Sequence, residues 1–154
     1  MKKLFIISIF LVVFTTMLSS QINKDSVSTG KKVSLTVGVL QGGGSLLGAD
    51  FEALLTDRVG FQLGAGLVGY GAGLNYHLKP GINSSFISLT YWHQGAGSTY
   101  TQSLLGPSFV YRAKKIFTAQ LGLGFVLGRG PAFPSSLTQT PVILLYSIGV
   151  YFPL

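Results

Sequence analysis

The sequence predicts an all-β fold, a closed antiparallel up-and-down transmembrane β-barrel of about eight strands. Three observations lead to this prediction. Apolar residues alternate with small or polar residues along eight segments, which indicates strands with two unlike faces. Charged residues make up only 10% of the 154 residues, against about 25% in an ordinary soluble domain. The segments have roughly the 9–11 residues that a tilted strand needs to cross a bilayer.

The first 20 residues have the layout of a secretory signal peptide. Met1-Lys2-Lys3 is basic, residues 4–18 are almost wholly apolar, and small polar residues follow. The apolar run is shorter than the roughly 20 residues of a spanning helix. We therefore expect cleavage near residue 20, with an uncleaved anchor as the alternative. Residues 21–31 are expected to be a flexible polar leader, and residues 32–154 the barrel.

Alternation with a period of two residues delimits the strands. Along one segment, for example, Phe61 and Leu63 share a face, while Gln62 and Gly64 share the other. The same pattern predicts strands at 32–40, 47–56, 59–68, 70–79, 85–93, 104–112, 116–127 and 142–152. On propensity alone, residues 49–58 also suit a helix, which would leave seven strands. Pro107 lies inside a predicted strand, where it removes a backbone donor.

The composition of the two faces predicts which one is outside. One face is a continuous row of Leu, Val, Phe and Tyr, and the other consists of Gly, Ser, Thr, Gln and Asn with few charges. Such a polar face is too small and too uncharged to coat a soluble protein. The apolar face is therefore expected to point outward to lipid. Closure is expected because lipid cannot satisfy the backbone groups of an open sheet edge.

The connections fall into tight, charged turns and longer, nearly uncharged segments. The tight turns lie at 57–58, 79–83 and 113–115, and the longer segments at 41–46, 93–103 and 128–141. Outer-membrane barrels place short turns in the periplasm and longer loops outside. We therefore expect the tight turns and both termini on the periplasmic side, and the longer segments at the cell surface.

The C-terminal segment carries a family resemblance. Tyr146, Ile148, Val150 and Phe152 form an alternating apolar strand with an aromatic residue close to the chain end. This strand resembles the C-terminal insertion signal of bacterial outer-membrane barrels. In pattern and length, the mature chain resembles the small eight-stranded OmpA/OmpX-type barrels. The resemblance implies an outer-membrane location in a diderm bacterium, insertion by the barrel-assembly machinery and contact with outer-membrane lipids, but no particular activity.

A small set of polar side chains is predicted to face the interior as a network. Its members are Asp50, Glu52, Gln62, Asn75, His77, Arg112 and Gln120. Because a buried acid is costly unless it is paired, Arg112 is expected to pair with Asp50 or Glu52. An interior of about eight strands is just wide enough for side chains to fill, so no porin-sized channel is expected.

Aromatic residues are predicted at the membrane interfaces, where amphipathic rings lie among the headgroups. They are Tyr70, Tyr76, Tyr91, Trp92, Tyr111, Tyr146 and Phe152. His93 follows Trp92 and lies near Ser98 and Ser103, which raises comparison with lipid A deacylases, whose His acts with a Ser and an acid. No acid follows Asp57 in the chain, so the triad is incomplete.

The remaining motifs predict no catalytic residue, cofactor or metal. Residues 64–69 match G-x-G-x-x-G, but a strand follows and no acid lies at the spacing of a dinucleotide site. His77 and His93 do not form a cluster of metal ligands. A net charge of +7 made of so few charges does not indicate nucleic-acid binding.

The sequence thus predicts an integral outer-membrane protein with a structural or surface-interaction role and an unidentified partner at the surface or in the periplasm. Two alternatives stay open: a lipid-modifying enzyme of the outer membrane, and a secreted lipocalin-like binder, which would need an apolar interior.

Overall fold

The computed structural model describes residues 30–133 and 141–154. The predicted signal peptide and the leader up to residue 29 lie outside the described residues. No helix within the described ranges is long and apolar enough to cross a membrane.

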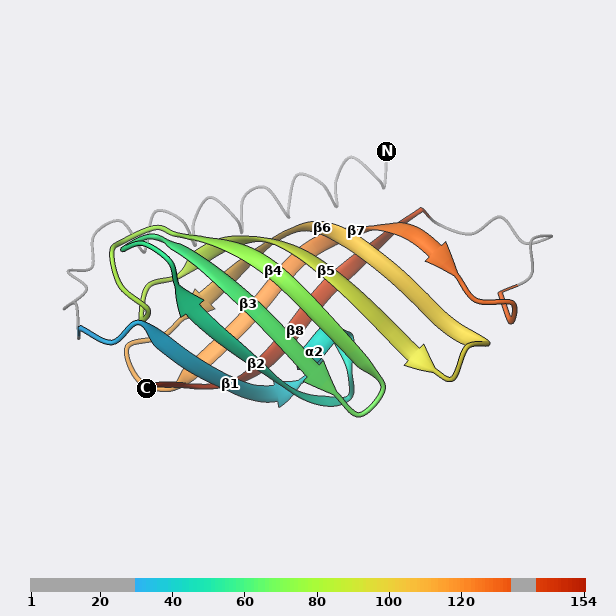
Figure 1. Cartoon of the computed structure of the whole chain (residues 1–154), viewed down its shortest axis with the longest axis horizontal. Coiled ribbons are helices and arrows are strands. Elements are labelled where there is room, and N and C mark those ends of the chain that lie inside the picture. The colour runs from blue at the N-terminus through green and yellow to red at the C-terminus, as the bar shows by residue number, and fades with distance from the viewer. Residues whose placement is uncertain (1–29, 134–140) are drawn as a thin grey trace, which may run out of the picture.

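The described residues form eight strands that close into a barrel (Figure 1). Each strand pairs antiparallel with the next, and β8 returns to β1, where Ser34 lies opposite Pro153. The prediction of an all-β, closed, up-and-down barrel is confirmed. The strands are β1 (Val33–Val39), β2 (Leu47–Leu54), β3 (Val59–Gly66), β4 (Gly69–His77), β5 (Phe86–Ala96), β6 (Tyr100–Arg112), β7 (Phe117–Arg129) and β8 (Val142–Pro153).

The two ends of the barrel differ in their connections. We call the end that carries the β2–β3, β4–β5 and β6–β7 connections, together with residue 30 and the C-terminus, the turn end. The opposite end, which carries the β1–β2, β3–β4, β5–β6 and β7–β8 connections, is the loop end (Figure 1).

Residues 49–54 and the segment around Pro107, for which the sequence left doubt about a strand, both lie in strands. β2 pairs along its length with β1 and β3, so residues 47–54 are strand despite their helix propensity, because neighbours on both sides take up the backbone groups. Pro107 lies in β6 opposite Leu89 of β5. On the side that faces β7, Gly106 and Pro107 have no paired partner. Pro107 lacks a backbone N–H, and a strand tolerates this where the neighbouring strand does not pair with it.

The connection between β1 and β2 folds into the barrel. The short segment α2 (Gln41–Gly44) has Gln41, Gly42 and Gly43 buried. Gly42 and Gly43 have φ values of 63° and 82°, which glycine adopts at little cost. A Cβ atom at either glycine would press on a backbone carbonyl of β3 or β4. Residues 41–46 were expected to be a surface loop, and that expectation is wrong for residues 41–43 and 45, which are buried at the loop end.

A hairpin lengthens one side of the loop end. β5 and β6 stay paired out to Gln94–Gln102 and Ala96–Tyr100, whereas β4 begins only at Gly69, opposite Gln94. The segment 93–103, expected as a loop, is therefore mostly strand, with its turn at 97–99.

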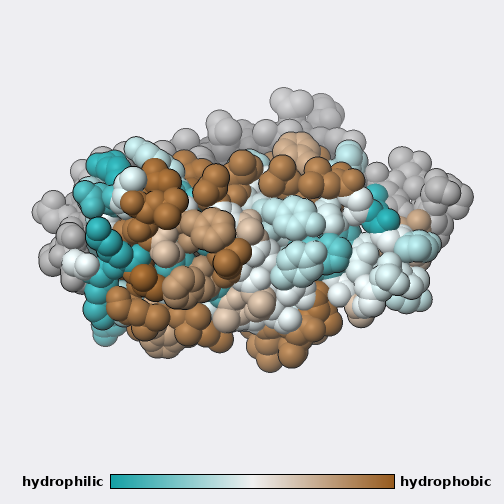
Figure 2. All heavy atoms as spheres, viewed as in Figure 1, coloured by the Kyte–Doolittle hydropathy of each residue, from teal (hydrophilic) through white to brown (hydrophobic). Residues whose placement is uncertain are grey.

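The polarity of the barrel is inverted relative to a water-soluble fold. Large apolar side chains along the strands point outward, and several are about half exposed, including Leu63 (51%), Leu89 (52%) and Ile148 (50%). Figure 2 shows this apolar surface over the middle of the barrel. The buried set is mostly polar, and among its members are Ser34, Glu52, Asn75, His77, Arg112 and Gln120.

Candidate functional site in the barrel interior

Glu52 is the centre of a buried polar network near the turn end. Its Oε2 atom lies 2.8 Å from Nη2 of Arg112 and accepts a hydrogen bond from Ser34 Oγ at 3.4 Å. Its Oε1 atom lies 3.0 Å from Nε2 of His77 and accepts from Nδ2 of Asn75 at 2.5 Å. Four side chains from β1, β4 and β6 thus satisfy both oxygens of one carboxylate.

Arg112 is held by further contacts on the same side of the interior. Its Nη1 donates to the backbone carbonyl of Ile82, and its Nη2 donates to Ser34 Oγ at 3.0 Å. The guanidinium lies over the rings of Phe86 and Tyr151, with Cζ 4.9 Å and 4.7 Å from the ring centroids. Cation–π attraction adds to the ion pair in such a geometry.

The β4–β5 connection closes the turn end beneath this network. Ile82 is 1% exposed. The carbonyl of Ser84 lies 3.1 Å from Nδ1 of His77, and Ser85 Oγ accepts from the backbone N–H of Arg112 at 2.9 Å. The connection therefore seals the interior with hydrogen bonds as well as with an apolar side chain.

A second polar layer lies between the Glu52 network and α2. Asp50 Oδ2 accepts from the backbone N–H of Gly42 at 3.2 Å, so this carboxylate holds α2. Gln120 donates to Ser108 Oγ at 2.8 Å and accepts from Ser147 Oγ at 3.2 Å. A small cavity between the layers is lined by Thr36, Gln41, Asp50, Gln62, Thr118 and Gln120, among others.

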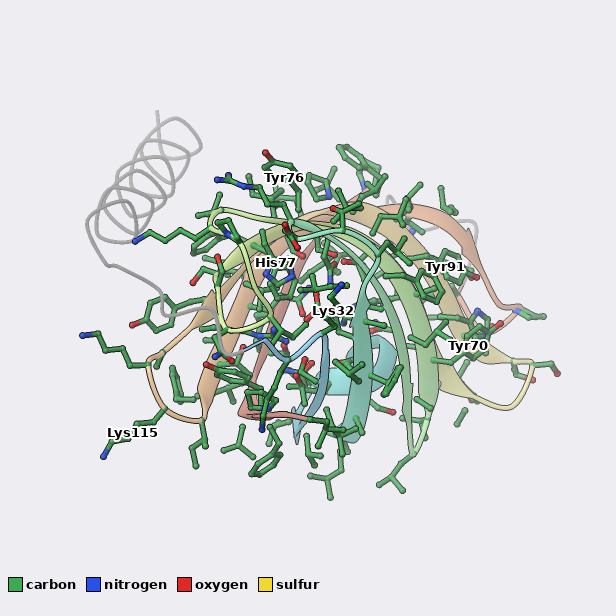
Figure 3. All side chains as sticks on the ribbon, turned by 60° about the vertical axis from the view of Figure 1, so that its left-hand side comes forward. Lys32, Tyr70, Tyr76, His77, Tyr91 and Lys115 are labelled. Atoms are coloured by element: carbon green, nitrogen blue, oxygen red, sulfur yellow. The ribbon has the colours of Figure 1, made fainter. Side chains whose placement is uncertain are left out.

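The predicted interior residues therefore divide into two groups. Glu52, Asn75, His77 and Arg112 come together, and Gln62 joins them through a 3.1 Å hydrogen bond from Asn75 Nδ2 to its Oε1. The other predicted residues, Asp50 and Gln120, lie in the second layer. Of the two acids offered as partners for Arg112, the geometry selects Glu52. Figure 3 shows His77 inside the barrel and the adjacent Tyr76 outside it.

An apolar cluster lies in the interior towards the loop end. Trp92 is 6% exposed and packs with Leu104 and Leu145, and a Cβ atom at Gly44 would approach its ring. The prediction that Trp92 lies at a membrane interface is therefore wrong. Alternation along β5 explains the error, because Trp92 shares its face with Ser88 and Thr90, which are also buried.

The other predicted interface aromatics lie on the outward face. Tyr70, Tyr76, Tyr146 and Phe152 are exposed, while Tyr91 and Tyr111 are partly buried. Tyr70 stacks on His93 at a centroid distance of 4.9 Å and lies 6.5 Å from Tyr91. Figure 3 shows Tyr70 and Tyr91 near one another on the outside of the barrel.

His93 pairs with a serine, and no described acid accompanies them. Its Nδ1 lies 2.9 Å from Ser103 Oγ, which also accepts from the Tyr91 hydroxyl at 3.2 Å. Among the described acids, Asp50 and Glu52 are buried in the interior and Asp57 is at the turn end. A Ser–His pair needs an orienting group to serve as a nucleophile and base, and no described carboxylate supplies it. No group of three potential metal ligands occurs in the described part of the chain.

The fold and the interior define a closed antiparallel barrel with an apolar exterior and a hydrogen-bonded polar interior. Comparisons of the chain with protein-family models, with curated proteins and with solved structures found no match.

Proposed function

We propose that the protein is an integral outer-membrane β-barrel with a structural or surface-interaction role and is not a general porin. One observation carries the proposal: apolar side chains such as Leu63, Leu89 and Ile148 point outward, while Glu52 and Arg112 are buried. The largest apolar patch on a typical soluble monomer covers about 300–600 Å². Here apolar side chains are exposed on every strand of the described barrel, which suits a lipid solvent.

The closed sheet supports the same proposal. Backbone groups in hydrocarbon must be paired within the protein, and a closed barrel is one of the few folds that achieves this. The β1–β8 pairing from Ser34–Pro153 to Val39–Ile148 leaves neither of these strands as an edge. The signal-peptide layout of residues 1–20 supports export, and insertion by the barrel-assembly machinery would follow.

The contents of the interior argue against a general porin and a lipocalin-like binder. From the turn end to the loop end, the β4–β5 connection, the Glu52 network and α2 occupy successive levels of the interior. A lipocalin-like binder would need an apolar cavity, whereas the cavity beside Asp50 is lined mainly by polar side chains. A lipid-modifying enzyme has the His93–Ser103 contact in its favour, but it would need a carboxylate from another source.

The experiment is fractionation of the full chain expressed in a diderm host. We expect the protein to sediment with outer membranes and to resist carbonate extraction. On a cold gel, the folded barrel should migrate differently from the boiled chain, because a closed barrel survives detergent until it is heated. Recovery in the soluble periplasmic fraction, with one mobility at both temperatures, would contradict the proposal.

A further inference from the structure

Basic side chains surround the turn end of the barrel. The residues just before β1 and each of the three strand connections at this end carry at least one. Lys31 and Lys32 precede β1, Arg58 lies in the β2–β3 turn, Lys79 in the β4–β5 connection, and Lys114 and Lys115 in the β6–β7 turn. The one acid among these segments is Asp57, so their side-chain charge is 6 − 1 = +5. We call these six residues the basic collar.

The loop end lacks such a feature. Arg129 is the charged side chain that its described connections and strand ends carry, and residues 130–141 contain no charged residue in the sequence. The exposed side chains at this end include Leu46, Leu67 and Tyr100, which are 68%, 74% and 67% exposed. The two ends of the barrel therefore differ strongly in charge.

The collar is distributed around the end of the barrel: Arg58 and Lys115 lie beside its apolar surface, and Lys32 lies at the opening of the ring (Figure 3). The four segments follow one another around the closed ring of strands. Leu55, 66% exposed, lies three residues from Arg58, and Ile116, 50% exposed, follows Lys115 directly. Figure 2 shows hydrophilic residues gathered at this end beside the apolar ones, and Figure 3 shows Lys115 extending away from the barrel.

The charges of the collar are not neutralised by described acids. Lys31 Nζ donates to the carbonyl of Pro153 at 2.9 Å, and Arg58 Nη1 donates to the carbonyl of Leu78 at 3.1 Å. The ion pairs found among the described residues belong to Glu52 in the interior. Within the part of the chain that the structure describes, no ion pair thus engages the collar.

We propose that the basic collar binds the headgroups of anionic phospholipids in the leaflet at the turn end. The inference rests on the proposed function, because it requires the barrel to span a bilayer. Long basic side chains next to an apolar belt keep their stems on the apolar surface and their charges at the headgroups. Basic residues near an anionic leaflet are attracted to it. A complete ring fits lipids packed around a barrel better than it fits a protein docked on one side.

The absence of cysteine makes a site-specific test simple. Single-cysteine variants Leu55→Cys at the turn end and Ser98→Cys at the loop end are labelled with the same fluorophore and inserted into mixed bilayers. Each bilayer contains phosphatidylcholine and phosphatidylglycerol in equal mole fractions, with bromine on the acyl chains of one of the two lipids. Quenching then reports which lipid lies beside the label.

We expect phosphatidylglycerol to be enriched about fivefold beside position 55, which corresponds to the attraction of about one basic residue per lipid. The enrichment should disappear in about 1 M salt, where the screening length is about 3 Å. Position 98 should show no preference. Replacing Lys31, Lys32 and Arg58, the collar residues in the segments next to position 55, by Gln should remove the preference there, while the control Arg129→Gln should leave it unchanged.

Two failures can be told apart. A heat-modifiable, inserted barrel without lipid preference at position 55 would overturn this inference alone, whereas a chain that never inserts would count against the proposed function.

Discussion

Arg112 and Glu52 form an ion pair across the lumen, with 2.8 Å between Nη2 and Oε2. Arg112 ends β6 and Glu52 lies in β2, and these strands are on opposite walls of the closed ring. Both side chains are 2% exposed. The pair therefore joins two walls that no backbone ladder connects.

Arg112→Ala should destabilise the barrel far more than Lys114→Ala. Removing one partner of a buried pair leaves the other charge uncompensated, at a cost of roughly 3–5 kcal/mol. Lys114 is exposed in a turn, where a charge contributes little to stability. The measurement is the urea midpoint of each variant in the same lipid or detergent. Equal midpoints would contradict the interior position of Arg112.

Gly42→Ala should be more destabilising than Gly97→Ala. The φ values of the two glycines are nearly equal, 63° and 64°, so both substitutions incur a left-handed strain of about 1–2 kcal/mol. Only Gly42 would also press a Cβ atom on the Ala65 carbonyl, since nothing lies within 4 Å at Gly97. The excess should be about 1–3 kcal/mol, as for overpacking in a core.

The reporters for this comparison are the free energy of unfolding and the emission of Trp92, the single tryptophan of the chain. Trp92 lies close to Gly44 of α2, so its emission should shift in Gly42→Ala and stay unchanged in Gly97→Ala. A Gly42→Ala variant as stable as Gly97→Ala would show that α2 does not pack inside the barrel.

Leu89→Arg should destabilise a membrane-inserted barrel, whereas Leu55→Arg should have little effect. Leu89 lies within β5 and is 52% exposed, and Leu55 lies in the β2–β3 turn and is 66% exposed. An outward arginine costs about 2–4 kcal/mol at the bilayer midplane and about 0–1 kcal/mol near an interface. Reversible unfolding in lipid vesicles measures both values. If water were the solvent, both substitutions would be nearly neutral, so equal small effects would count against a lipid-facing exterior.

Purified protein should form no stable, porin-sized channel in planar bilayers. The Glu52 network and the β4–β5 connection obstruct the turn end, and α2 obstructs the loop end. Single-channel recording provides the measurement. Large, uniform conductance steps that persist after purification would mean that these segments leave the lumen.

Local alternation predicted the strands because each of them has one apolar and one polar face. The predicted strand 59–68 and β3 (Val59–Gly66) begin at the same residue, and residues 49–58 resolve as part of β2 and a turn. Strand faces depend only on neighbours in sequence, which explains this success. The same alternation puts Trp92 on the inward face of β5. The prediction of Trp92 at a membrane interface did not take this alternation into account.

Features that depend on distant residues were not predictable in this way. Asp50 and Glu52 face inward on the same strand, and only the stagger of β2 against β6 determines which of them meets Arg112. The inward fold of α2 depends on space left by Gly64 and Gly71, which lie close to Gly42 and Gly43. The glycine run 42–44 was the available signal, since three such residues permit left-handed backbone and close approach.

If the barrel spans a membrane, as proposed above, the cross-lumen pair constrains how the chain would enter a bilayer. Glu52 and Arg112 become neighbours only when the ring is closed, and closure requires β1 to meet β8, more than 100 residues away. An open sheet in hydrocarbon would expose both charges as well as two unpaired strand edges. Insertion and closure of this barrel are therefore expected to occur together. Glu52 and Arg112 are then shielded from lipid only when β8 pairs with β1.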